Sequence, residues 1–144
     1  MPNQGVTNIL SEQLLVKFTQ ILSKASGMKT MCIGDHNPVS RKSCEMITAA
    51  YDTVHKFRFI EKSKPVVIIP LQRRKFNNTQ TWESSMCALS NHKLVDYVVD
   101  IQSCSIIDVV DRIKPDFIFI SRELPEALQI ENFAKKLRIK LIRV

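Results

Sequence analysis

Residues 29–43, Lys-Thr-Met-Cys-Ile-Gly-Asp-His-Asn-Pro-Val-Ser-Arg-Lys-Ser, decide the fold, because an apolar run passes through a tight turn directly into a helical pattern. The run at residues 31–33 predicts a short buried strand, and Gly34 allows the backbone after it to turn sharply. Ser40 is of a residue type that caps helices, and the first backbone amides of a helix attract anions. This stretch therefore predicts a strand, a turn and a helix, with a phosphate-binding site at the turn.

Further along the chain, apolar strands alternate with helical patterns. The predicted helices cover residues 41–55, 79–89, 105–113 and 125–137, and the later predicted strands cover residues 65–70, 94–101, 117–120 and 140–144. Residues 71–78 are polar and basic and predict a loop, and Ser105 with Asp108 has the pattern of a capping box. Five strands separated by helices predict a parallel sheet with helices on both faces and a ligand site at the carboxyl ends of the strands.

An amphipathic helix is expected ahead of this unit. Apolar residues recur at helical spacing between Leu10 and Leu22, and Gly27 is expected to end the helix, which gives a helix at residues 8–25. We therefore divide the chain into an N-terminal helical extension at residues 1–28 and one domain at residues 29–144. The apolar stripe of the helix predicts packing on its own sheet or on a partner, as a homodimer or in a complex with another protein.

Length and composition fit one compact domain of 144 residues, with 44% hydrophobic and 24% charged residues. No apolar run approaches the ~20 residues of a membrane-spanning helix, and no secretory leader pattern is present, which predicts a soluble cytoplasmic protein without a membrane partner. The four cysteines show neither Cys-x-x-Cys pairing nor histidines at metal spacing. We therefore expect reduced, mostly buried thiols and no metal held by the protein alone.

The formal net charge of +7 is concentrated between Lys56 and Lys75, a segment in which Glu61 is the only acid. Such a basic segment attracts phosphate groups. Two interpretations stay open: a solvated helix end and loop, or contact with a phosphorylated ligand or nucleic acid. Aromatic residues are sparse near the segment, so a surface for stacking bases has little support.

Four segments, in chain order, resemble those of the cytidylyltransferase-like nucleotidyltransferases. The turn at residues 29–43 resembles the family's first signature, residues 91–99 and 113–120 resemble its Val-Asp-x-Val-Val strand and its Lys-Pro-Asp turn, and residues 133–142 resemble its last helix and strand. The resemblance covers residues 29–144 and implies a Rossmann-like fold with a parallel five-stranded sheet. It also implies an activity, which is transfer of a nucleotidyl group from CTP or ATP, with Mg²⁺, to a small phosphorylated acceptor.

The family's signature is His-x-Gly-His at the start of the first helix, where this chain has Ser40, Arg41, Lys42 and Ser43. In active relatives the two histidines stabilise charge that develops on the triphosphate as the α-phosphate is attacked. Ser40 and Ser43 offer only neutral hydrogen bonds, whereas Arg41 and Lys42 offer positive charge beside the histidine positions. The resemblance thus implies the family's fold, but this chain has serines where the family has its two signature histidines.

The candidate site residues gather around the first turn and two later segments. The candidate catalytic residues are His36, Ser40, Lys42 and Ser43. The candidate nucleotide-binding residues are Gly34, Asp35, Arg41, Arg73, Arg74, Lys75, Ser121 and Arg122. The resemblance implies that one of the three basic residues at 73–75 replaces a phosphate-contacting lysine. His36, two residues after Gly34, is interpreted either as a nucleotide-contacting residue or as an exposed turn residue.

Three functions remain in view. The first is a nucleotidyltransferase-like protein that binds CTP or ATP and transfers the nucleotidyl group, and we lead with it because fold indicates class better than it excludes variant chemistry. The second is an inactive relative, a pseudoenzyme that serves as a protein-binding or assembly subunit, which the replacement of both signature histidines favours. The third is binding to the phosphate backbone of nucleic acid through the basic segment.

Overall fold

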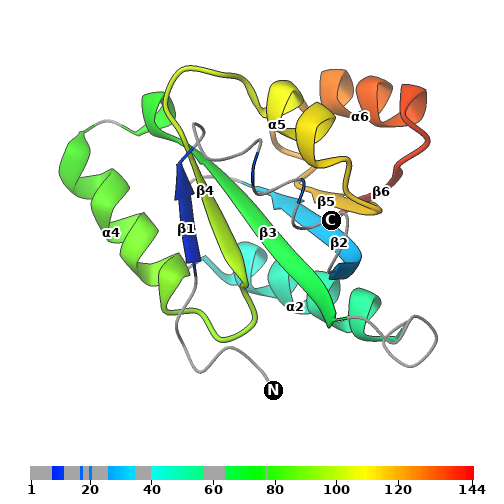
Figure 1. Cartoon of the computed structure of the whole chain (residues 1–144). Helices are drawn as coiled ribbons and strands as arrows, with labels where there is room; N and C mark the ends of the chain where they lie inside the picture. The colour runs from blue at the N-terminus through cyan, green and yellow to red at the C-terminus, as the bar shows by residue number, and fades with distance from the viewer. Residues whose placement is uncertain are drawn as a thin grey trace.

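The computed structural model describes residues 8–11, 17, 20, 26–34, 40–56, 64–76 and 78–144, of which 8, 26, 27, 64, 74 and 79 are described by their backbone alone. The strands are β1 Asn8–Ser11, β2 Ser26–Ile33, β3 Lys64–Gln72, β4 Tyr97–Ile101, β5 Phe117–Ile120 and β6 Lys140–Arg143 (Figure 1). The helices are α2 Arg41–His55, α4 Thr79–Ser90, α5 Ile106–Ile113 and α6 Ala127–Lys136, with a short 3-10 helix, η2, at Arg73–Lys75.

The described strands form one parallel sheet in the order β1-β4-β3-β2-β5-β6. From β2 the chain moves outward through β3 to β4, and then returns to the other side of β2 to add β5 and β6. The ends of β2 and β5 are therefore neighbours where the strand order reverses, and Ile33 pairs with Ile120 there. In open α/β sheets, ligands bind at such a switch point, outside the carboxyl ends of the strands.

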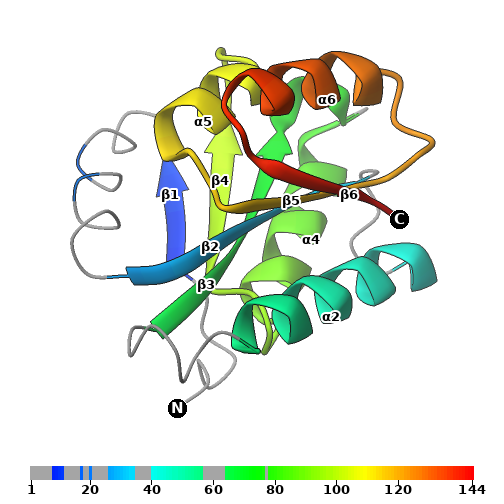
Figure 2. The ribbon, with the colours of Figure 1, turned by 90° about the vertical axis from the view of Figure 1, so that its right-hand side faces the viewer.

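Helices cover both faces of the sheet, as predicted. Helices α2 and α4 pack on one face, and α5 and α6 pack on the other (Figure 2). Within β3, Val66 and Ile68 belong to the core under α5 and α6, whereas Val67 and Ile69 belong to the core against α2 and α4. Because both faces are buried, the apolar run of β3 does not alternate with polar residues.

Side chains cap the helices at the carboxyl edge of the sheet. At α2, Ser40 Oγ accepts a hydrogen bond from the Ser43 amide. At α5 the predicted capping box is confirmed, because Ser105 Oγ accepts from the Asp108 amide (3.2 Å) and the Asp108 carboxylate accepts from the Ser105 amide (3.0 Å). These bonds fix where each helix leaves the strand before it.

The prediction of five strands was wrong, because the sheet has a sixth. Residues 8–11, predicted as the start of a helix, form β1, which pairs in parallel with β4. Leu10 packs against the core while Ile9 is 51% exposed, which is the alternation of a strand. Pairing with the open side of β4 outweighs the helical spacing of this segment. Apart from Lys17 and Gln20, whose backbone is helical, the remainder of the predicted helix at residues 8–25 lies outside the described residues.

Several predicted boundaries shift by a few residues. Gly27 lies inside β2 instead of ending a helix, β3 continues to Gln72 in the predicted loop, β4 begins at Tyr97 instead of residue 94, and Pro125 precedes α6. Strand limits follow the hydrogen-bonded register with neighbours, here Ile68 beside Tyr97, which local composition does not encode.

The cysteines are all free, as predicted, but only Cys32 is buried. Burial raises the pKa of the Cys32 thiol to about 12, which makes it unreactive. Cys44 and Cys87 are exposed, which corrects the expectation of mostly buried thiols, because α2 and α4 carry them on their outer faces. No helix in the described part of the chain is long and apolar enough to cross a membrane.

Candidate functional site

Three segments meet at the carboxyl edge of the sheet beside the switch point. Gly34 and the first turn of α2 follow β2, η2 follows β3, and the turn at residues 121–126 follows β5. The Ser121 amide donates to the carbonyl of Ile33 (3.0 Å), which ties the end of β5 to the end of β2. The topology therefore brings Gly34 and Ser40, the last three residues of the basic segment at 73–75, and the Ser121 turn to the same edge, whereas Lys56 and Lys64 lie toward the opposite edge.

The two serines at the start of α2 bond to each other. Ser40 Oγ accepts from the Ser43 amide (3.1 Å) and donates to Ser43 Oγ (3.0 Å). Ser43 is also buried, at 8% exposure. Both hydroxyls therefore help to start α2, and neither is a cation that would stabilise developing phosphate charge.

The two basic residues between these serines lie on the surface. Arg41 pairs with Glu45 one turn along α2 (3.1 Å), and its side chain is 93% exposed. Lys42 forms an ion pair with Glu123, which links the first turn of α2 to the turn after β5. Lys42 therefore reaches across the switch point, whereas Arg41 stays on its own helix.

The basic residues of η2 take different directions. Lys75 forms an ion pair with Glu126 ahead of α6, and Lys75 lines the same cavity as Gly34 and Ser43. Arg73 instead donates to both oxygens of Asp100 (3.2 and 3.3 Å). Its guanidinium also lies 3.9 Å from the ring centroid of Trp82. Arg73 therefore contacts β4 through Asp100 and α4 through Trp82.

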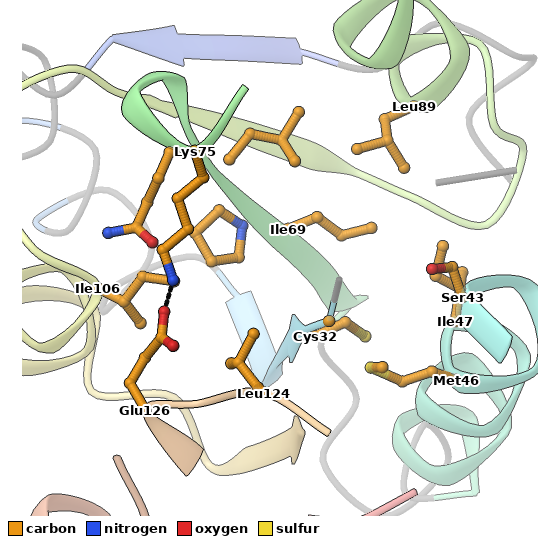
Figure 3. A pocket seen from close by; sticks show the side chains of 14 residues that line it. Cys32, Ser43, Met46, Ile47, Ile69, Lys75, Leu89, Ile106, Leu124 and Glu126 are labelled. Carbon is orange, nitrogen blue, oxygen red and sulfur yellow. Dashed lines mark ion pairs between the residues drawn. The ribbon is translucent and has the colours of Figure 1, made fainter. Parts of the chain in front are cut away.

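The cavity at this edge is small and mainly apolar. Figure 3 shows the ion pair of Lys75 and Glu126 at one end and Ser43 with Met46 at the other. Its volume is about 30 Å³, enough for one or two water molecules. A Cβ on Gly34 would meet the Met46 methyl group at 3.0 Å, so glycine permits this close approach. A nucleotide can therefore lie only at the rim of this cavity, outside it.

The remaining predicted site residues are less informative. Asp35 and His36 lie outside the described residues, and Arg74 is described by its backbone alone. Ser121 Oγ accepts from the Glu123 amide (3.4 Å), and Arg122 is exposed. The described histidines lie toward the opposite edge: His55 ends α2, and His92 precedes β4. Burial lowers the pKa of His92, whose Nδ1 accepts from the Leu94 amide (3.1 Å).

Sequence reasoning missed four polar residues at this edge. Asp100, Glu123 and Glu126 pair with the cations described above, and Gln72 is buried at the end of β3. The sequence did offer one indication of these acids, because two of them lie in the turn at residues 121–126, directly after a buried strand. The carboxyl ends of parallel strands meet at one edge of the sheet, which is where the ligand site was predicted. Among the described residues, no group of three His, Cys, Asp or Glu side chains is arranged to hold a metal.

No protein-family model and no curated protein matches the sequence. Among solved structures, the chain is similar to a lipopolysaccharide core biosynthesis protein from Thermoplasma volcanium GSS1, with a TM-score of 0.60 and 14% identity over 81% of this chain and 95% of that chain. It also matches a universal stress protein in complex with cAMP, with a TM-score of 0.42 and 11% identity over 83% of this chain and 98% of that chain. At 14% identity the first likeness shows the fold alone, which is a Rossmann-like α/β fold.

Proposed function

We propose that the protein binds a nucleoside triphosphate, CTP or ATP, at the carboxyl edge of the sheet and transfers its nucleotidyl group slowly or not at all. One observation carries the proposal: Lys75 lines the same cavity as Gly34 and Ser43, beside the point where the strand order reverses. A cation, a glycine turn and a helix N-terminus at a switch point together suit a phosphate chain.

The phosphates would lie at the rim of the cavity, in reach of Lys42 and Lys75. In the free protein each of these lysines pairs with an acid, Glu123 or Glu126. Binding would exchange those carboxylates for phosphate oxygens, which form charge-assisted hydrogen bonds with lysine. In the free protein a carboxylate therefore balances the charge of each lysine, and the phosphates of the ligand compete with Glu123 and Glu126 for the two lysines.

Magnesium fits this arrangement as a companion of the nucleotide. Mg²⁺ keeps several waters and is usually held by substrate phosphates with one or two carboxylates. Glu123, once released by Lys42, would be the carboxylate that contacts the metal; the metal would supply charge neutralisation at the phosphates.

The hydrogen bond between the two serines is the reason to expect slow nucleotidyl transfer. Attack on the α-phosphate needs preorganised positive charge where negative charge develops. Ser40 and Ser43 are neutral and already bonded to each other (3.0 Å). Transfer to a small phosphorylated acceptor would therefore depend on Lys42 and Lys75 alone.

A second candidate function, a protein-binding or assembly subunit, is favoured by strand β1. It is an edge strand of the described sheet, and Ile9 on it is 51% exposed. An unpaired edge accepts a strand from another chain. Sedimentation of the wild type against Ile9→Lys tests this: a dimer or complex that the lysine dissociates supports it, and a monomer in both cases with no partner recovered contradicts it.

Isothermal titration calorimetry with CTP and ATP, each with Mg²⁺, tests the main proposal. We expect saturable binding that weakens at least several-fold in Lys75→Gln, which removes the charge and leaves a polar side chain one atom shorter. Lys93→Gln is the matched control, because Lys93 is exposed in the loop before β4, toward the opposite edge. Absence of heat at millimolar nucleotide, or equal weakening in both variants, would reject the site.

A further inference from the structure

Gln72 carries a buried hydrogen-bond acceptor without a partner. It is the last residue of β3, its side chain is only 4% exposed, and Oε1 has no hydrogen-bond partner among the described residues. Leaving such a group unpaired costs free energy, and a leucine there would avoid that cost. Thr30 and Trp82 also carry an unpaired buried atom, but neither lines a hollow beside the switch point.

Gln72 lies in the wall between two hollows. One is the small cavity shared by Gly34 and Lys75, and the other is a larger hollow of about 250 Å³ between the end of β3 and the starts of α5 and α6. Ile106 and Glu126, both labelled in Figure 3 among the residues that line the small cavity, line the larger hollow as well, so the two adjoin. A ligand with its phosphates at the cavity rim can therefore place its other end in the larger hollow.

The larger hollow suits an uncharged, flat group. Three isoleucines from α5 and α6, Ile106, Ile107 and Ile130, supply apolar walls, and none of the described residues that line it is a lysine or an arginine. Its one charged residue, Glu126, is paired with Lys75. The volume is slightly below the ~300–1,000 Å³ of sites for whole drug-sized ligands, which fits part of a nucleotide.

We propose that this hollow holds the base of the bound nucleotide and that Gln72 selects a base with an amino group. The inference rests on the proposed function and adds the class of nucleotide. A carboxamide matches the edge of adenine or cytosine, where an amino donor stands beside a ring-nitrogen acceptor. The amino group donates to the buried Oε1 atom. In the orientation that the Gln72 carboxamide has here, the keto oxygen of hypoxanthine or uracil would face Oε1, which sets two acceptors against each other. A carboxamide that turns over freely would remove this preference and would give equal binding of both kinds of base.

Matched nucleotide pairs test the inference on the unaltered full chain. Calorimetry would compare ATP with ITP and CTP with UTP, all with Mg²⁺, because the members of each pair differ mainly in an amino or keto group. We expect the amino member to bind roughly 5- to 150-fold more tightly, the range of one well-placed bidentate contact. The pair with the larger difference identifies the base.

Variants assign the selectivity to Gln72. Gln72→Leu should bring the members of each pair within about twofold, whereas Gln80→Leu, at an exposed position on α4, should keep the preference. Equal binding of both members by the wild type, or a preference that survives Gln72→Leu, would overturn this inference alone. Absence of binding by all four nucleotides would overturn the proposed function and this inference with it.

Discussion

At the residue scale, two serines at the start of α2 decide what this turn contributes. Ser40 Oγ accepts from the Ser43 amide and donates to Ser43 Oγ, so the two serines take part in the cap of α2. The identities of these residues are visible in the sequence, but their mutual bond is not, because it depends on the rotamers that the cap geometry selects.

Ser40→Ala should lower the free energy of unfolding by about 1 kcal/mol, the usual cost of losing an N-cap. Urea unfolding with an unchanged m-value would measure it. Ser84→Ala, at an exposed position on α4, is the control and should change stability little. Equal stability of Ser40→Ala and the wild type would show that the cap does not contribute.

Pyrophosphate release should be slow in the wild type and faster after Ser40→His with Ser43→His. One preorganised donor typically contributes ~10² to 10³ in rate, about 2.7 to 4 kcal/mol. The assay uses CTP and ATP with a panel of phosphorylated alcohols. Rapid release by the unaltered protein would contradict the proposal of weak catalysis and would assign the role to Lys42, Lys75 or His36.

At the element scale, ion pairs join the segments that follow neighbouring strands. Lys42 with Glu123 links α2 to the turn after β5, and Lys75 with Glu126 links η2 to the start of α6. Lys75 and Glu126 are each only about a quarter exposed, at 25% and 22%, so their charges are less screened than those of surface pairs. These pairs tie the segments around the cavity to one another.

Glu126→Gln should strengthen nucleotide binding, because it removes an anion that competes with phosphate for Lys75. We expect about 1 kcal/mol, close to fivefold in Kd. Calorimetry with Mg²⁺ present measures the change, and Glu83→Gln, at an exposed position on α4, should leave Kd unchanged. Weaker binding by Glu126→Gln would indicate that this carboxylate itself contacts the ligand or its metal.

The loop before β4 should make stability depend on pH. Burial lowers the pKa of His92, so the folded protein binds a proton there more weakly than the unfolded chain does. The contribution of His92 to the free energy of unfolding is therefore complete above the pKa of an unfolded histidine, about 6.5, and it decreases as the pH drops below that value. Urea midpoints at pH 7.5 and 5.5 should differ less in His92→Asn than in the wild type; an equal difference would contradict the assignment.

At the scale of the whole molecule, most of the described core could be predicted from the sequence. The apolar runs of β3 and β5 and the capping box of α5 identify buried parallel strands and their helices, because those features are local. The sixth strand could not be predicted, since β1 forms by pairing with β4, which is distant in the chain. The small cavity and the acids that pair with its lysines likewise arise only when three segments meet at one edge.

The most direct test of nucleotide binding at the carboxyl edge is an NMR titration of the ¹⁵N-labelled protein with ATP or CTP and Mg²⁺. We predict that the largest amide shifts fall on Gly34, residues 40–43 and residues 72–75, with smaller ones at Ser105 and Glu126. Shifts confined to the opposite edge, near His55 and His92, or no shifts at millimolar nucleotide, would contradict the account.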